Sequence, residues 1–139
     1  GGMSSFTAAP FYAVVATLVI GGANPLLIGL ASGLGISISD TIFYKIGVQF
    51  RKGAKIKYEK YVNKLSRWLH GRSEITIGIV VYIYTAFTPF PNDLLFISLA
   101  LGNYKLKKII TPLVLGDITH MLLIAHLVFY LGARVINVL

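Results

Sequence analysis

The chain alternates between long apolar stretches and short polar ones, and the apolar stretches differ in length. Residues 6–50 are apolar, with breaks predicted at Pro10 and at residues 21–25, where glycine, asparagine and proline gather. The stretch Phe11–Ile20 covers only about 15 Å as a helix, half of a hydrocarbon core of about 30 Å. Leu26–Phe50 is long enough to cross such a core, so we expect a short helical arm followed by a spanning helix.

A second apolar region, residues 75–101, is broken near its middle by a polar, proline-rich turn. The turn contains Thr88, Pro89, Pro91, Asn92 and Asp93. Two prolines and an acid cannot continue a regular helix, so we expect the first arm of this region to end there. After a short basic run, Ile109–Gly132 covers about 36 Å as a helix and is predicted to span.

The polar region between the apolar ones, residues 51–74, has a helical period. Apolar and aromatic residues, Trp68 among them, recur there at three- and four-residue steps, and lysines and arginines fill the other positions. This pattern predicts a basic amphipathic helix that lies in the headgroup layer of a membrane. The alternative is an exposed helix packed on the rest of the protein.

Composition supports a membrane protein. Of the 139 residues, 55% are hydrophobic and 13% are charged, and the mean hydropathy is +0.74. A soluble domain carries about 25% charged residues, and a short soluble chain could not bury so much apolar surface. These figures exclude a disordered protein, a coiled coil and an ordinary soluble enzyme. The absence of cysteine excludes disulfides, thiolate metal sites and a cysteine nucleophile.

The distribution of positive charge predicts the topology. The net charge is +8, and eight of the thirteen lysines and arginines lie between Arg51 and Arg72, beside apolar segments, which favours lipid headgroups over nucleic acid. A smaller basic cluster contains Lys105, Lys107 and Lys108. If residues 75–101 enter the membrane and fold back at the prolines, both clusters lie on one side. The positive-inside rule favours that layout, with residues 51–74 on the cytoplasmic side of the cell (plasma or inner) membrane.

The two apolar regions resemble each other at an offset of 81 residues. Seven positions match: Phe6 and Phe87, Thr7 and Thr88, Pro10 and Pro91, Leu18 and Leu99, Gly21 and Gly102, Leu34 and Leu115, and Gly35 and Gly116. Inverted repeats with broken helices are a common plan for transporters. We therefore expect one membrane domain built from a first repeat (6–50), the basic helix (51–74) and a second repeat (75–132). The first repeat lacks a first arm, so either the chain begins inside a hairpin or a neighbouring subunit of a homo-oligomer supplies that arm.

Three segments resemble the DedA family, also called SNARE-associated or VTT-domain membrane proteins. The first is residues 33–47, with Gly35, Asp40, Tyr44 and Gly47 at its characteristic positions. The second is the turn from Phe87 to Asn92, which is similar to the family's proline-rich re-entrant tip. The third runs from Leu115 to Gly132 and resembles the family's last span, so that the likeness covers nearly the whole chain.

The resemblance implies two re-entrant hairpins that face each other, and movement of phospholipid or polyprenyl phosphate between leaflets. Bacterial members carry two arginines around the second tip, where this chain has Ala86 and Asn92. Their acidic residue in the first hairpin has no counterpart near Pro10. These departures argue against proton coupling and tight phosphate binding, and they leave passive scrambling or another substrate open.

The candidate transport residues are polar groups inside apolar segments. Asp40, Asp93 and Asp117 are the acids found there, and an ionisable residue at membrane depth is a functional candidate by default. Asp93 could instead cap the returning arm, and Asp40 could bond to a serine or threonine of a neighbouring helix. His120 lies three residues after Asp117 on the same helix face, so the pair could relay protons or form a satisfied polar pair.

We therefore predict an all-α membrane protein that transports lipid and is not an enzyme, because no hydrolase motif is present. No cofactor, metal or nucleic acid is expected, and membrane lipids are the partners. The predicted substrate site contains Asp40, Thr88, Pro89, Pro91, Asn92, Asp93, Asp117 and His120. Arg51, Lys105, Lys107 and Lys108 are predicted to contact anionic lipid or only to set the topology. The predicted structural motif contains Pro10, Gly35, Tyr44, Gly47, Gly102 and Gly116. A proton-coupled small-solute or ion transporter and a non-catalytic assembly subunit are the alternatives.

Overall fold

Helices make up all the regular structure in the described part of the chain, as the sequence predicts. The computed structural model describes residues 5–50, 59–88, 95–96, 98–99 and 104–138. The helices are α1 (Ser5–Ile20), α2 (Pro25–Phe50), α3 (Glu59–Leu69), α4 (Glu74–Phe87) and α6 (Leu106–Val138).

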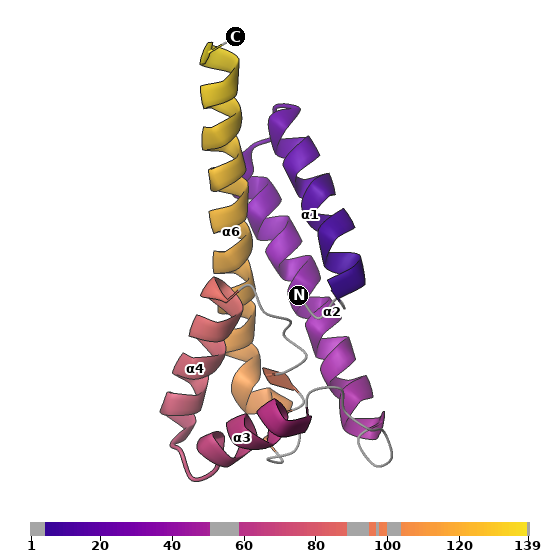
Figure 1. Cartoon of the computed structure of the whole chain (residues 1–139), viewed down its shortest axis with the longest axis vertical. Helices are drawn as coiled ribbons and strands as arrows, with labels where there is room; N and C mark the ends of the chain where they lie inside the picture. Colours follow the sequence, from indigo (N-terminus) through magenta and orange to yellow (C-terminus); the bar gives the residue numbers. More distant parts are fainter. Residues whose placement is uncertain (1–4, 51–58, 89–94, 97, 100–103, 139) are drawn as a thin grey trace.

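Two long antiparallel helices, α2 and α6, form the axis of the molecule (Figure 1). The two shorter helices lie beside opposite halves of this pair. α1 packs on the upper half in the view of Figure 1, against both α2 and α6, and α4 packs on the lower half against α6. α3 lies across the lower end, next to the start of α4 and of α6. We call α1 and α4 the half-length helices, because each is about half as long as α6. Each of them has one end near the middle of the molecule.

The turn between α1 and α2 forms where the sequence places it. Gly22 adopts φ +99°, a conformation that favours glycine, and the backbone N–H of Ala23 donates to the carbonyl of Leu18 (3.0 Å). The side chain of Asn24 then caps α2 by accepting from the backbone N–H of Leu26 (2.9 Å). These local bonds reverse the chain and start the long helix α2 at Pro25.

The break expected at Pro10 is wrong. α1 begins at Ser5 and continues through Pro10 to Ile20. Proline lacks an N–H group, and Pro10 is the sixth residue of α1, beyond the first four residues whose N–H groups have no helical partner, so one helical bond is lost there. The helix continues past Pro10 in spite of this lost bond, so this proline alone does not stop it.

The basic helix ends earlier than the predicted residue 74. In the described residues it covers Glu59–Leu69, and a turn with Gly71 at φ +80° follows; the predicted start, residues 51–58, lies outside the described residues. Ser73 caps the next helix by accepting from the N–H of Thr76, so Glu74 belongs to the first turn of α4. On α3, Leu69 is fully buried whereas Trp68 is 46% exposed. The helix thus packs on the protein through leucine and leaves tryptophan on the surface.

The last helix is longer than the predicted Ile109–Gly132. α6 begins at Leu106 and ends at Val138, so it includes Lys107, Lys108 and Arg134. Lysine, arginine, leucine and alanine are good helix formers, and a single glycine without a following proline does not end a helix.

After α4 the chain returns to the end from which α4 began. The hydroxyl of Tyr104 donates to the carbonyl of Leu69 (2.8 Å), and Lys108 forms an ion pair with Glu74. The first residue of α4 and the first turn of α6 are therefore neighbours. α4 itself ends at Phe87, and Thr88 follows in an extended conformation, as the sequence predicts for this break.

Two separate apolar cores hold the helices together. The lower core joins α2, α3, α4, α6 and residues 95, 96 and 99, and it contains Tyr44, Leu69, Ile77, Val81, Leu95, Phe96, Leu99, Ile109 and Leu113. The upper core joins α1, α2 and α6 and contains Val15, Ile36 and Met121. The polar residues described below lie between these two cores.

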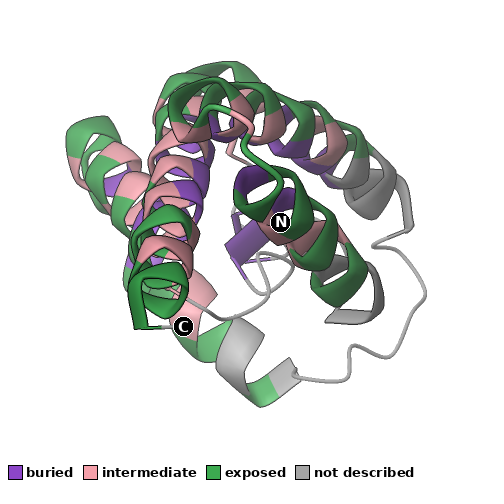
Figure 2. Ribbon diagram, turned by 90° about the horizontal axis from the view of Figure 1, so that it is seen from above, coloured by how far each residue is buried: buried purple, intermediate pink, exposed green. Residues whose placement is uncertain are grey.

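The outer faces of the long helices are apolar and exposed. α2 and α6 are long and apolar enough to cross a membrane, and only 28% and 11% of their most apolar stretches are buried inside the molecule. Exposed residues cover the outside of the bundle in Figure 2, and they include large side chains such as Leu27, Ile38, Tyr130 and Ile136. A soluble monomer rarely exposes apolar surface on this scale, so the surface is suited to lipid.

Candidate functional site

The candidate site depends on a close approach between α2 and α6. A Cβ atom added to Gly33 would lie 2.6 Å from the Cα of Ile118, and one added to Gly29 would lie 3.0 Å from the Cα of Leu122. Gly29 and Gly33, which are four residues apart on α2, therefore form a surface that packs against α6 of the same chain. Glycine lets the two backbones meet, and so it sets which residues of α2 and α6 face each other.

Two buried aspartates lie just below this contact. Asp40 of α2 is 0% exposed and Asp117 of α6 is 2% exposed. The two carboxyl groups are close enough to interact electrostatically. The hydroxyl of Ser37 lies 3.0 Å from Oδ2 of Asp117 and 2.9 Å from the carbonyl oxygen of Gly33, so Ser37 joins α2 to Asp117. Ser37 thus bonds across the helix interface, to Asp117 of α6.

His120 connects both half-length helices to α6. Its Nδ1 lies 3.0 Å from the carbonyl oxygen of Ala86, and its Nε2 lies 2.9 Å from the hydroxyl of Tyr12. A carbonyl only accepts, so Nδ1 carries a proton, and in the neutral ring Nε2 accepts from Tyr12. Ala86 is in the last turn of α4, where carbonyl groups have no helical partner. His120 therefore caps α4 with one nitrogen and holds α1 with the other.

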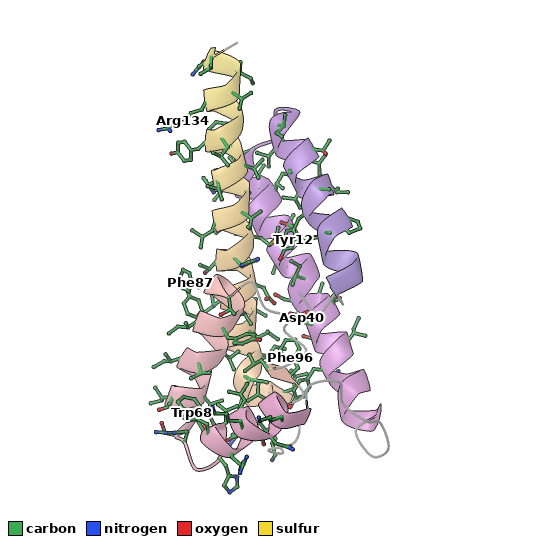
Figure 3. The ribbon with its side chains drawn as sticks, viewed as in Figure 1. Tyr12, Asp40, Trp68, Phe87, Phe96 and Arg134 are labelled. Atoms are coloured by element: carbon green, nitrogen blue, oxygen red, sulfur yellow. The ribbon has the colours of Figure 1, made fainter. Side chains whose placement is uncertain are left out.

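Tyr12 completes the cluster from α1. It interacts electrostatically with both Asp40 and Asp117, and its ring meets that of His120 edge to face, with the centroids 5.9 Å apart. We define the central cluster as Tyr12, Ser37, Asp40, Asp117 and His120. Figure 3 shows Tyr12 and Asp40 near the middle of the molecule, with Phe96 of the lower core below them.

The contact between α4 and α6 is equally close beside the cluster. A Cβ atom on Gly116 would overlap the hydroxyl of Thr85 and lie 3.1 Å from the carbonyl oxygen of Tyr82. The hydroxyl of Tyr82 in turn bonds to that of Thr119 (3.0 Å). These contacts fix the end of α4 against α6 at the level of Asp117.

The predicted site residues fall into three groups. Asp40, Asp117 and His120 belong to the central cluster. Thr88 directly follows the end of α4, two residues after Ala86, whose carbonyl bonds to His120. The predicted site residues that lie outside the described part of the chain are Pro89, Pro91, Asn92, Asp93, Gly102 and Arg51. The remaining lysines, Lys105, Lys107 and Lys108, are exposed at the lower end, where Lys108 pairs with Glu74.

Five of the predicted motif residues lie in the described part of the chain, and beside Pro10 of α1 the other four have different environments. Gly116 is buried at the contact with Thr85, whereas Gly35 is exposed with no atom within 4 Å of an added Cβ. Tyr44 is buried, and its hydroxyl donates to the carbonyl of Tyr104 (2.6 Å). Gly47 lies in the last turns of α2.

The sequence reasoning missed Tyr12. Its signal was a single hydroxyl in the otherwise apolar stretch Phe11–Ile20, which is too weak to distinguish from an interfacial tyrosine. His126, by contrast, bonds to the carbonyl of Leu122 in its own helix (2.7 Å). Among the residues that the structure describes, no three histidines or acids come together in a way that could hold a metal ion.

The chemistry of the central cluster follows from its composition. It holds two carboxyl groups, an imidazole and two hydroxyl groups. Such a set can take up a proton or a cation at its carboxyl groups and can form hydrogen bonds to a polar headgroup.

Comparison of the chain with protein-family models, with curated proteins and with solved structures gave no match.

Proposed function

We propose that the chain is a membrane-embedded transport protein that moves a phospholipid or a polyprenyl phosphate between leaflets. The observation that carries the proposal is the burial of Asp40 and Asp117 at the middle of an apolar bundle. An ionisable group at membrane depth costs at least about 2.5 kcal/mol on insertion scales, and such groups mark transport pathways. The likeness to the DedA family points to the same class of function.

In this proposal α2 and α6 cross the bilayer, and α1 and α4 are the short arms of two inverted re-entrant repeats. The ion pair between Glu74 and Lys108 and the bond from Tyr104 to Leu69 support a hairpin for the second repeat, because they join its two ends. A chain that crossed the membrane in this region would separate those ends by the thickness of the bilayer. Irregular backbone at membrane depth requires protein or water around it, and the central cluster is beside the end of α4.

The cluster would lower the barrier for a headgroup while the acyl tails stay in lipid. The hydroxyl groups of Tyr12 and Ser37 can exchange their present bonds for bonds to phosphate oxygens. The carboxyl groups of Asp40 and Asp117 suit the ammonium part of a zwitterionic headgroup. No bond in the substrate is made or broken, so the protein acts as a transporter and not as an enzyme.

A proton- or cation-coupled solute transporter is the second candidate. The observation that favours it is the electrostatic interaction between the buried carboxyl groups of Asp40 and Asp117, because two such groups in one site can bind a proton or a cation. The two candidates share the same residues and differ in whether lipid moves.

The test is a liposome assay with fluorescent phospholipid and, separately, fluorescent polyprenyl phosphate. We expect the protein to speed lipid exchange over empty vesicles, and Asp40→Asn and Asp117→Asn each to slow it about tenfold or more, equivalent to about 1.4 kcal/mol. Tyr130→Phe, which removes a hydroxyl from an exposed position of α6, is the control and should exchange lipid at the normal rate.

The outcomes separate the candidates. If neither lipid crosses faster than in empty vesicles, lipid transport is refuted. Uptake of a solute or cation that requires Asp40 and Asp117, without lipid exchange, would establish the second candidate. Normal exchange in both aspartate variants would remove the central cluster from the mechanism.

A further inference from the structure

The lower end of the molecule carries a strongly basic surface. Seven exposed lysines and arginines gather there on α3, on the turn after it and at the start of α6 (Figure 1). We define the basic end as Lys60, Lys64, Arg67, Arg72, Lys105, Lys107 and Lys108. Trp68 is exposed on the same surface, and the guanidinium of Arg72 lies 4.8 Å from the centre of its ring. Basic residues beside an exposed tryptophan are typical of a surface that lies on anionic headgroups.

A pocket of about 160 Å³ opens within this basic end, between the starts of α4 and α6. It is lined by Glu74, Ile77, Tyr104, Lys105, Lys108 and Ile109. Ile77 and Ile109 are buried members of the lower core, so the floor of the pocket is apolar, while both lysines are exposed at its rim. An apolar floor with a cationic rim matches a phosphate that is attached to a lipid.

Tyr104 makes this pocket rigid. Its hydroxyl donates to Leu69 (2.8 Å), its backbone N–H donates to Leu99 (3.1 Å), and its carbonyl accepts from Tyr44 (2.6 Å). These three bonds hold the residue from three different parts of the chain. The wall of the pocket is therefore in place before a ligand arrives, which reduces the entropy lost on binding.

Glu74 forms an ion pair with Lys108 at the rim of the pocket. The two side chains are 68% and 51% exposed, and an ion pair in water at such exposure is weak. A lipid phosphate can take the place of the carboxylate beside Lys108 and gain Lys105 as a second cation. Glu74 thus acts as a competitor whose removal should strengthen binding.

We propose that this pocket binds the phosphate of an anionic membrane lipid, separately from the central cluster. The proposal rests on the membrane placement in the proposed function, but it does not require that lipid be transported. The ligand is an anionic phospholipid of the leaflet that faces the basic end, because the pocket lies in the surface that carries the positive charge and the exposed tryptophan.

The test measures binding to the full chain in a neutral detergent by titration with short-chain phosphatidylglycerol and with phosphatidylcholine. We expect phosphatidylglycerol to bind more tightly, and Lys105→Gln and Lys108→Gln each to weaken it about fivefold, as expected for one lysine at a lipid phosphate. Glu74→Gln should strengthen binding. Arg134→Gln is the control, because it removes one positive charge from an exposed position of the same helix, outside both the pocket lining and the basic end.

Several results would overturn the proposal. Equal affinity for the two lipids would show that the net negative charge of the headgroup is not recognised, and equal weakening by Arg134→Gln would assign the effect to the net charge of the protein. Competition by glycerol phosphate at the same concentration as the lipid would show a site for free phosphate instead. Helical circular dichroism checks that each variant is folded. Binding can fail while lipid exchange in liposomes persists, and the reverse also holds, so the two proposals are tested independently.

Discussion

At the scale of single residues, His120 makes the most informative contacts. Its two nitrogens reach a carbonyl of α4 and a hydroxyl of α1, and both helices are too short to span a membrane alone. The bond to Ala86 fixes the proton on Nδ1 and leaves Nε2 to accept from Tyr12. One side chain thus sets how both half-length helices sit on α6.

Removing the hydroxyl of Tyr12 should measure this link. We expect Tyr12→Phe to lower the free energy of unfolding by about 0.5–1.5 kcal/mol, the usual net value of one hydrogen bond. In a His120→Phe background the same substitution should cost nearly nothing, because the partner is already lost. Unfolding in mixed micelles, followed by circular dichroism, checks both values. An equal loss in the two backgrounds would show that Tyr12 stabilises the protein by other contacts.

Sequence reasoning found three members of the central cluster but not the hydrogen bonds that connect its members. Asp40, Asp117 and His120 were selected because charge is rare in apolar segments. Their partners depend on the register between α2 and α6, and the close approach at Gly29 and Gly33 sets that register. A pattern along one helix does not encode which residue of another helix it will face, so the bond between Ser37 and Asp117 could not be predicted.

At the scale of elements, glycine decides how closely the helices pack. Gly116 and Gly35 occupy matched positions in the two halves of the sequence, yet their surroundings differ. Gly116 is pressed against Thr85 of α4, and Gly35 faces open space. α4 thus packs against α6 at a position for which the first half has no counterpart.

This difference predicts opposite effects for the same substitution. Gly116→Ala and Gly33→Ala should each destabilise the fold by about 1–3 kcal/mol, the usual cost of overpacking. Gly35→Ala should be neutral or stabilising by up to about 1 kcal/mol, because alanine is the better helix former. Thermal unfolding in detergent compares the three variants. A destabilising Gly35→Ala would mean that another chain covers this face.

The elements themselves were largely predictable, with errors at their ends. The apolar lengths and the turn at residues 21–25 gave the helices and their first connection, because those signals are local. Pro10 did not break α1, because a proline removes only one helical hydrogen bond and the rest of this apolar segment is helical. α6 ran past Gly132 because nothing after that residue stops a helix.

At the scale of the whole molecule, the chain brings its positive charge to one end. α3 and the starts of α4 and α6 lie together there, while Arg134 is at the opposite end of α6 (Figure 3). For such an arrangement in a membrane, the positive-inside rule predicts that the basic end faces the cytoplasm.

The absence of native cysteine allows this topology to be tested with single-cysteine variants. In sealed vesicles, Trp68→Cys and Lys105→Cys should react with an impermeant maleimide from the same side, and Arg134→Cys from the other. The physical reason is that Tyr104 bonds to Leu69, so residues 68 and 105 cannot lie on opposite surfaces. Labelling of the first two from opposite sides would disprove the re-entrant arrangement.

The half-length helices also have a consequence for the surrounding bilayer. α1 has 16 residues and α4 has 14, or about 24 Å and 21 Å of helix, against a hydrocarbon thickness of about 30 Å. Lipids beside a short apolar wall compress to match it, at a cost of fractions of a kcal/mol per Å. In a bilayer the protein would therefore be flanked by two thinned patches, one towards each leaflet, and vesicles made from shorter acyl chains should accommodate it with less deformation.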